Sequence, residues 1–505
     1  MFARKTLLIM GSRITMGLFG FISWYFITNY IFVDYVGSVG FAISYIGLFG
    51  LITELGFSSA HIKRVSEGQD LGTCIGTYAA IKIVLLAAFT LLVFGSIWGY
   101  RNIYPQRDFA NSYDEEVIYI MLAWSILAQL TVVITSTFIG KQQIAKAQVN
   151  LWVGALIQAV FTIIIVLNFN DVHILASTWV VGALVTLIMG VFMMRGTRIK
   201  PPTWHMIKDY TKFALPLMLV TGIAPIALYL DKLMVKLFWE NADVAILWNA
   251  QKYAQLPQQI SAAVVTVLFP AFSSLVSSGS IKKVRDLTRQ AERYISMVMI
   301  PLILLLIAMA TPFIVLVSDN AYTESGPIFA ILLGWVAFRT LQNPYTAHFG
   351  SFDKPVYSLY ISLLYMPLNL ILNILLIPES IYGIPLAGLG GKGAAIATLT
   401  AASINYFFVR YLSSRLIKTG VNWRIFRHIV AAGIPACTLY IVQSQWVSLD
   451  RWFEISGAMA LGLIIYLLLL ILFREFTRKE VIFILDTMHP GKMLGYIRDE
   501  MKQRT

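Results

Sequence analysis

Residues 455–473 read ISGAMALGLIIYLLLLILF, an uninterrupted apolar run without a charged side chain. A helix of about 20 apolar residues crosses the hydrocarbon core of a bilayer, so this run predicts a transmembrane helix. Comparable runs recur along the chain, separated by charged segments or by segments rich in proline and glycine. About fourteen spans result, with predicted bounds at 6–32, 38–62, 74–99, 116–139, 146–168, 173–194, 210–238, 244–276, 293–317, 326–349, 355–377, 393–414, 427–447 and 455–473.

The composition of the whole chain agrees with this interpretation. Of 505 residues, 58% are hydrophobic and only 13% are charged, whereas a soluble domain carries about 25% charged residues. The composition therefore excludes an ordinary soluble enzyme. We predict an all-α polytopic membrane protein with about 14 transmembrane helices, which leaves little sequence for a soluble domain.

The net charge of +13 is distributed unevenly between alternate connections. If the N-terminus is cytoplasmic, most Lys and Arg fall in inner connections such as 195–212 and 282–293, while the outer connections are mainly acidic. This asymmetry follows the positive-inside rule. It predicts a multi-pass protein of the cytoplasmic membrane with both termini in the cytoplasm, and nucleic-acid binding is not needed to explain the charge.

A basic, proline-bearing connection, RGTRIKPPTWHMIKDYTK at 195–212, follows the first six spans and predicts a hinge between two lobes. FIGKQQIAKAQVNLWV (138–153) is weakly similar to HFGSFDKPVYSLYISL (348–363), which favours duplicated six-span halves. The last two spans are then additions. The predicted divisions are an N-terminal lobe at 1–200, a C-terminal lobe at 201–415, two further helices at 416–474 and an amphipathic cytoplasmic tail at 475–505.

The sequence contains no pattern for catalysis, metal binding or ATP binding. Its six histidines lack the spacing of metal ligands. GLGGKG at 388–393 matches the letter pattern of a phosphate-binding loop. It is not predicted to bind phosphate, because it lies in a predicted external loop and no Ser or Thr follows the Gly-Lys pair. We therefore predict no catalytic residue, no metal and no cofactor. We expect that transport is driven by a source such as coupling to H+ or Na+.

Charged residues inside the predicted spans are the strongest functional signal, because a charge at the bilayer centre is costly and usually faces a cavity or a partner. The bases are Arg13, Lys82, Lys232, Lys236, Lys252 and Arg339, and the main acids are Glu54 and Asp231. The excess of positive charge predicts an anionic substrate, since a phosphate or pyrophosphate group neutralises several bases at once.

Helical periodicity distinguishes among these bases. Arg13, Lys252 and Arg339 each lie on a helix face that also carries glycine or amide residues, so we expect these three side chains to line a cavity. The Lys236 side chain is expected to extend toward the outer membrane interface. The Lys82 side chain is expected either to extend toward the inner interface or to line the cavity.

The two acids allow two interpretations. Glu54 and Asp231 either couple transport to a cation or form structural ion pairs with neighbouring bases. Both alternatives stay open on the sequence alone.

Several segments, in a fixed order and spacing, carry a family resemblance. They are LGFSSAHIKRVSEG (55–68), YLDKLMVKLFWENADVAILWNAQKY (229–253), LFPAFSSL (268–275), LNLILNILLIP (368–378) and GLGGKGAAIATL (388–399). Through them the chain resembles the multidrug/oligosaccharidyl-lipid/polysaccharide exporter superfamily, in its polysaccharide-biosynthesis branch of Wzx-type flippases.

The resemblance implies two six-helix lobes around a central cavity, two additional C-terminal helices and alternating access. It also implies a substrate, a polyprenyl-(di)phosphate-linked oligosaccharide that moves from the inner to the outer leaflet for cell-surface polysaccharide biosynthesis. The expected partners are this anionic glycolipid, membrane lipids and a glycan polymerase or ligase. The bases that match cationic cavity residues of the family are Arg13, Lys232, Lys252 and Arg339.

Two related functions remain as alternatives. A peptidoglycan-precursor lipid flippase also has fourteen spans and a cationic cavity. A cation-coupled multidrug exporter usually has twelve spans and uses acidic cavity residues, a role for which Glu54 and Asp231 are the candidates.

Overall fold

The computed structural model describes residues 2–103, 112–221, 226–354, 356–446, 449 and 451–475. These residues form helices almost throughout, apart from an antiparallel hairpin of β1 (Ser380–Ile381) and β2 (Ile384–Pro385). In the described part of the chain, nine helices are long and apolar enough to cross a membrane. The predicted all-α membrane fold is confirmed, and each predicted span coincides with one helix or with two consecutive helices.

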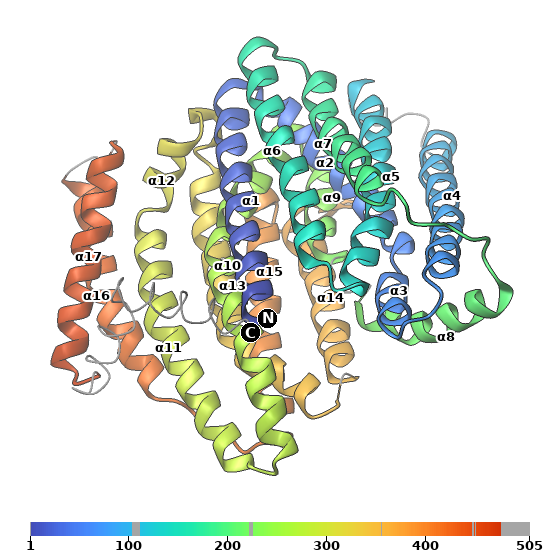
Figure 1. The fold of residues 1–505 in the computed structure, drawn as a ribbon. Coiled ribbons are helices and arrows are strands. Elements are labelled where there is room, and N and C mark those ends of the chain that lie inside the picture. The colour runs from blue at the N-terminus through green and yellow to red at the C-terminus, as the bar shows by residue number, and fades with distance from the viewer. Residues whose placement is uncertain are drawn as a thin grey trace.

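The first seven helices form a bundle, called here the first bundle (Figure 1). Inside it α1 packs against α6, α5 against α7 and α2 against α5. The bounds are α1 (Phe2–Tyr30), α2 (Val33–Gly50), α3 (Phe57–Ser66), α4 (Leu71–Ile103), α5 (Ser112–Gly140), α6 (Ile144–Asn168) and α7 (Val172–Met193).

Helices α9 to α15 form the second bundle, in which α13 packs against both α10 and α15. The break between α11 and α12 divides the span that was predicted at 293–317. The bounds are α9 (Ile226–Phe238), α10 (Asn241–Ser277), α11 (Ile281–Ala308), α12 (Ala310–Val317), the short 3-10 helix η2 (Asn320–Tyr322), α13 (Ser325–Ser351), α14 (Val356–Leu376) and α15 (Gly390–Leu416).

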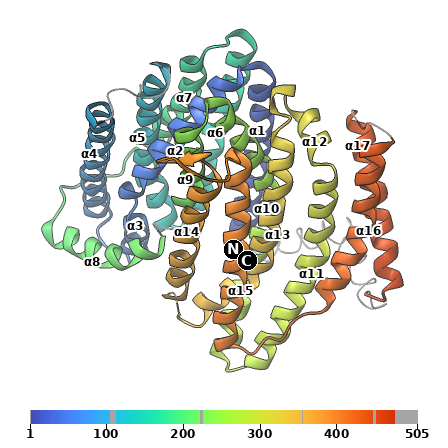
Figure 2. The same ribbon diagram turned by 180° about the vertical axis from the view of Figure 1, so that it is seen from behind.

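The remaining helices lie at the two edges of the molecule. α16 (Arg424–Gln445) and α17 (Trp452–Leu472) stand at the edge opposite α4 in both views (Figures 1 and 2), where α16 packs against α11. α8 (Trp204–Thr221) packs against α3 and α4, although the predicted boundary at 200 assigns its sequence to the second lobe. The predicted domain limits stay predictions, and the predicted tail lies outside the described residues except for Glu475.

The predicted hinge is tethered to the first bundle. The backbone N–H of Lys200 donates to the Gly72 carbonyl at 3.1 Å, and Lys200 Nζ lies 2.7 Å from Asp70 Oδ1. The hydrogen bond from Lys200, together with those from Thr73, holds the pKa of the Asp70 carboxyl well below its usual range. The connection between the bundles is therefore fixed at the start of α4.

The span predicted at 38–62 is not one continuous helix. α2 ends at Gly50, a 3-10 turn η1 (Leu51–Thr53) follows, and α3 begins only at Phe57. Leu55 and Gly56 adopt left-handed conformations, with φ of 37° and 80°, a geometry that ends a helix. The break leaves Glu54 in a turn between two helices.

The two bundles touch at one end of the molecule, called here the junction end, which is uppermost in Figure 1. There Gly37 of α2 lies against Asn241 of α10, and a Cβ on Gly37 would stand 1.8 Å from the Asn241 carbonyl oxygen. A Cβ on Gly40 would stand 2.7 Å from the Trp248 ring. Small residues thus permit close contact between α2 and α10.

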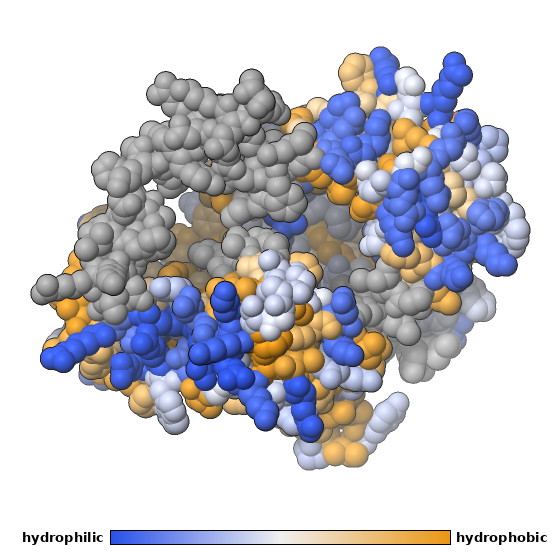
Figure 3. Space-filling view, turned by 60° about the horizontal axis from the view of Figure 1, so that its bottom comes forward, coloured by the Kyte–Doolittle hydropathy of each residue, from blue (hydrophilic) through white to orange (hydrophobic). Residues whose placement is uncertain are grey.

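The opposite end is called here the basic end and carries α3, α8 and the turn between α10 and α11. Figure 3 shows hydrophilic residues gathered in two groups on this face, on either side of a hollow. The molecule is therefore closed at the junction end and hollowed at the basic end.

Candidate functional site

Lys252 lies within α10, where the two bundles meet. Its side chain is exposed although it lies inside a helix of 37 residues, eleven residues after the first residue, Asn241. The ammonium group lies 5.3 Å from the Trp24 ring of the first bundle and 5.5 Å from the Trp248 ring of the second. Such cation–π contacts stabilise a charge where full hydration is lost. The exposed ammonium group of Lys252 is therefore accessible to an anion.

Trp24 itself connects the bundles. Its ring centroid lies 4.5 Å from that of Trp248, and its indole N–H donates to Asn249 Oδ1 at 2.8 Å. Trp24 shares a helix face with Arg13, eleven residues earlier, but sequence analysis assigned it no role. The periodicity signal was present, but the partner on α10 could not be inferred from it.

Lys232 is buried in α9 beside Lys252. Its ammonium donates to Gln251 Oε1 at 3.1 Å, and the charges of Lys232 and Lys252 interact with each other. Two like charges in proximity repel, so an anion that binds near both gains from each of them. The structure thus brings together two of the four predicted substrate-binding bases.

Arg13 is exposed on α1, eleven residues before Trp24. This spacing places both side chains within about 20° on the same helix face, about 16 Å apart along the axis. Between them, a Cβ added at Gly17 or at Gly20 would meet no atom within 4 Å. Arg13 therefore lies on a face of α1 that no neighbouring segment covers at Gly17 and Gly20.

Arg339 is exposed on α13. Arg339 and Arg13 thus belong to different bundles. Within the described part of the chain, neither forms a hydrogen bond or a ring contact with Lys252.

Asp231 precedes Lys232 on α9, about 100° around the helix, and is buried with 3% of its surface exposed. Its carboxylate accepts hydrogen bonds from Asn373 Nδ2 at 2.8 Å and from Thr398 Oγ1 at 2.9 Å. Asn373 Nδ2 also lies 3.2 Å from Asn369 Oδ1. Asp231 is therefore the centre of an oxygen-rich cluster between α9, α14 and α15, and sequence analysis did not foresee its three neutral members.

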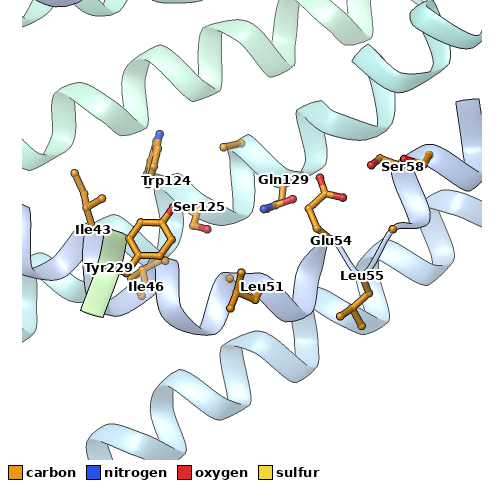
Figure 4. A pocket seen from close by; sticks show the side chains of 15 residues that line it. Ile43, Ile46, Leu51, Glu54, Leu55, Ser58, Trp124, Ser125, Gln129 and Tyr229 are labelled. Atoms are coloured by element: carbon orange, nitrogen blue, oxygen red, sulfur yellow. The ribbon is translucent and has the colours of Figure 1, made fainter. Parts of the chain in front are cut away.

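Glu54 lies at the break after α2 and forms an ion pair with Lys82 of α4. Its Oε1 is 3.8 Å from the Lys82 ammonium, which also donates to the Thr53 carbonyl at 2.8 Å. Lys82 is completely buried, whereas the Glu54 side chain is 42% exposed. Glu54 borders a cavity of about 360 Å³ that is separate from the bases around Lys252 (Figure 4).

The expected position of Lys236 is wrong. It does not extend to the interface but is buried, with its ammonium 3.0 Å from Asp114 Oδ2 at the start of α5. Asn241 Nδ2 donates to the same carboxylate at 3.0 Å. A cation–π contact of this ammonium with Phe41, 5.7 Å from the ring centre, accompanies the buried ion pair across the junction end.

Comparison with known proteins agrees with this geometry. A family model described as polysaccharide biosynthesis protein matches residues 2–276. The chain belongs to this family, and the predicted superfamily is confirmed. It is therefore a multi-pass membrane transporter and not an enzyme.

One curated relative is the probable low-salt glycan biosynthesis flippase Agl15 of Haloferax volcanii, which is 20% identical over 405 residues, covering 77% of this chain and 79% of Agl15. Among solved structures, the lipid II flippase MurJ in an inward closed conformation superposes with a TM-score of 0.74 at 14% identity, over 92% of this chain and 98% of MurJ. An inward-facing multidrug resistance MATE transporter of the same superfamily gives 0.61 at 16% identity, over 80% and 96%. At these identities the solved structures establish the fold.

Proposed function

We propose that this protein is a flippase that moves a polyprenyl-(di)phosphate-linked oligosaccharide from the inner to the outer leaflet, for cell-surface polysaccharide biosynthesis. The observation that carries the proposal is the exposed Lys252 ammonium within α10, with Lys232 hydrogen-bonded to the preceding residue, Gln251. A membrane transporter keeps a charge at this depth when an ionic group of its substrate binds there. The flippase Agl15, a relative by sequence, supports a glycan substrate.

The mechanism follows from the two ends of the molecule. With the basic end in the cytoplasm, as the positive-inside rule requires, the hollow admits the headgroup from the inner leaflet. Arg13 and Arg339 attract the phosphate groups toward Lys252, and the polyprenyl chain stays in the lipid. Opening of the junction end then releases the headgroup on the other side. Both termini are cytoplasmic in this orientation, and a polymerase or ligase consumes the product.

Reconstituted vesicles with a fluorescent undecaprenyl diphosphate-linked sugar test the proposal. Combined replacement of Arg13, Lys252 and Arg339 by Gln is expected to reduce the initial flipping rate at least tenfold, because each charged hydrogen bond to a phosphate contributes about 1.5–3 kcal/mol. Lys392→Gln is the matched control, since its exposed ammonium pairs with Glu324 at the junction end, away from the hollow. An unchanged rate in the correctly folded triple variant would refute the assignment of these bases.

The peptidoglycan-precursor flippase and the cation-coupled drug exporter are distinguished in the same vesicles. Flipping of lipid II in preference to other sugar lipids would favour the first alternative. Efflux of a cationic dye that disappears with Glu54→Gln or Asp231→Asn would favour the second.

We assign cation coupling to Asp231. The carboxylate is surrounded by Asn373, Thr398 and Asn369, and Asn373 Oδ1 is buried without a hydrogen-bond partner among the described residues. Carboxylate, amide and hydroxyl oxygens suit a hard cation such as Na+, and a proton on Asp231 would be an equivalent charge carrier.

Asp231→Asn is expected to abolish the acceleration of flipping by an imposed Na+ or pH gradient while retaining downhill flipping. Asp286→Asn serves as the control, because that carboxylate is exposed at the basic end. Gradient dependence that survives Asp231→Asn would show that coupling, if present, uses another group.

A further inference from the structure

We infer that the cavity beside Glu54 is a subsite for one sugar ring of the transported glycolipid. The inference rests on the proposed function and names the part of the substrate that this second site takes. The cavity has a volume of about 360 Å³, within the range of pockets that enclose small ligands.

The lining has two chemically different ends (Figure 4). Trp124 of α5 and Tyr229 of α9 lie at one end, Gln129 and Glu54 lie at the other, and Ser125 stands between them. A pyranose ring has the same division, because its C–H groups form an apolar face while its hydroxyl groups project from the edge. Aromatic rings offer the apolar face a matching surface.

The unsatisfied atoms at the polar end specify what the ligand must provide. Glu54 Oε2 and Gln129 Oε1 are both buried, and neither has a hydrogen-bond partner among the described residues. Both atoms are acceptors, so the ligand must bring donors. Hydroxyl groups satisfy this requirement, whereas a phosphate group brings only acceptors and is repelled by Glu54.

Local charge balance favours a neutral ligand over a cation. The Lys82 ammonium, 3.8 Å from Glu54, already compensates the carboxylate. A second positive charge in the cavity would be repelled by Lys82 as well as attracted by Glu54. A hydroxyl-rich ring gains the hydrogen bonds without this repulsion.

The subsite lies next to the bases that would hold the phosphates. Tyr229 and Lys232 are three residues apart on α9, which brings their Cβ atoms within about 5–6 Å. A diphosphate near Lys232 therefore directs the first sugars of the chain toward Tyr229. Tyr229 also packs on α2, where a Cβ at Gly47 would stand 2.5 Å from its ring, so the cavity is complete only while α9 contacts α2.

Cysteine protection tests the inference directly. Cys437, which is exposed, is first replaced by Ser, while the buried Cys74 is kept. Ser59→Cys then reports on the cavity, which Ser59 lines as an exposed residue. Gln255→Cys reports on the surroundings of Lys252, three residues earlier on α10. Maleimide labelling is measured with undecaprenyl diphosphate and with the same lipid carrying N-acetylglucosamine.

The sugarless lipid is expected to slow labelling only at Gln255→Cys, and the sugar-bearing lipid is expected to slow it at least fivefold at both positions. Protection at Gln255→Cys without protection at Ser59→Cys by the sugar-bearing lipid would overturn the inference and leave the proposed function intact. Absence of protection at both positions by both lipids would instead overturn the proposed function.

A competition measurement provides the second readout. Two variants are compared: Gln129→Leu, and the double variant Glu54→Gln with Lys82→Met, which preserves the charge balance. Each is expected to weaken binding of the sugar-bearing lipid roughly tenfold. Binding of sugarless undecaprenyl diphosphate should not change. Glu324→Gln is the matched control, because this carboxylate is exposed at the junction end. Equal losses for both lipids would contradict a sugar subsite.

Discussion

Replacement of Asp114 by Ala is expected to open the junction end. Asp114 is completely buried, and its carboxylate accepts from both Lys236 and Asn241. Removing one partner of a buried ion pair costs about 3–5 kcal/mol, since the other charge is left without compensation. In a conformation with separated bundles, Lys236 reaches water and this cost disappears. The population should therefore shift more than about a hundredfold toward the open junction.

Spin labels at Tyr30 and Leu237, exposed residues of the two bundles, measure this opening as an increase in their separation. Glu116→Ala is the matched control, because that carboxylate lies on the same helix but is 64% exposed. The double variant Asp114→Ala with Lys236→Met should restore the closed distance in part, because no buried charge remains. The same distance distribution in Asp114→Ala and in the unmodified protein would contradict a role for this ion pair in closure.

Replacement of Arg293 by Ala is expected to loosen the attachment of the two C-terminal helices. Arg293 of α11 donates through Nε to Glu475 Oε1 at 2.7 Å and through its second amino group to the Glu475 backbone carbonyl. Glu475 is the third residue after the end of α17 and is 2% exposed. Arg424, Arg427 and His428 lie farther from its carboxylate, at 3.5 to 3.6 Å.

The loss of Arg293 leaves Glu475 with weaker partners in a buried position, and we expect the free energy of unfolding to fall by about 3 kcal/mol. Thermal inactivation in detergent would show this as a lower midpoint. Arg289→Ala is the control, one helical turn earlier on α11 with an exposed side chain. If both variants had equal midpoints, Arg293 could not be the principal attachment of α17.

The sequence was sufficient to predict an all-α membrane fold, because apolar runs of bilayer length indicate helices that cross a membrane. It could not locate every interruption. The break between α2 and α3 at residues 51–56 contains no proline, so the sequence did not indicate that the helix ends there.

The candidate site was predictable as a set of charges but not as a set of contacts. A buried charge stands out in one helix, whereas its partner comes from a distant segment. Asp114, for example, was assigned to an outer connection by its position in the sequence, yet it is the partner of Lys236. The pairing of Glu54 with Lys82 likewise depends on how α2 and α4 pack, which helical periodicity does not reveal.

The indole rings around Lys252 have a consequence for the order of events in transport. The ammonium touches Trp24 from one bundle and Trp248 from the other, so it takes part in holding the bundles together. A phosphate that draws the ammonium away from these rings removes an attraction between the bundles. Substrate binding and separation of the bundles then depend on the same ammonium group. The protein without substrate keeps the cation–π contacts between the bundles, and the protein with bound substrate loses them.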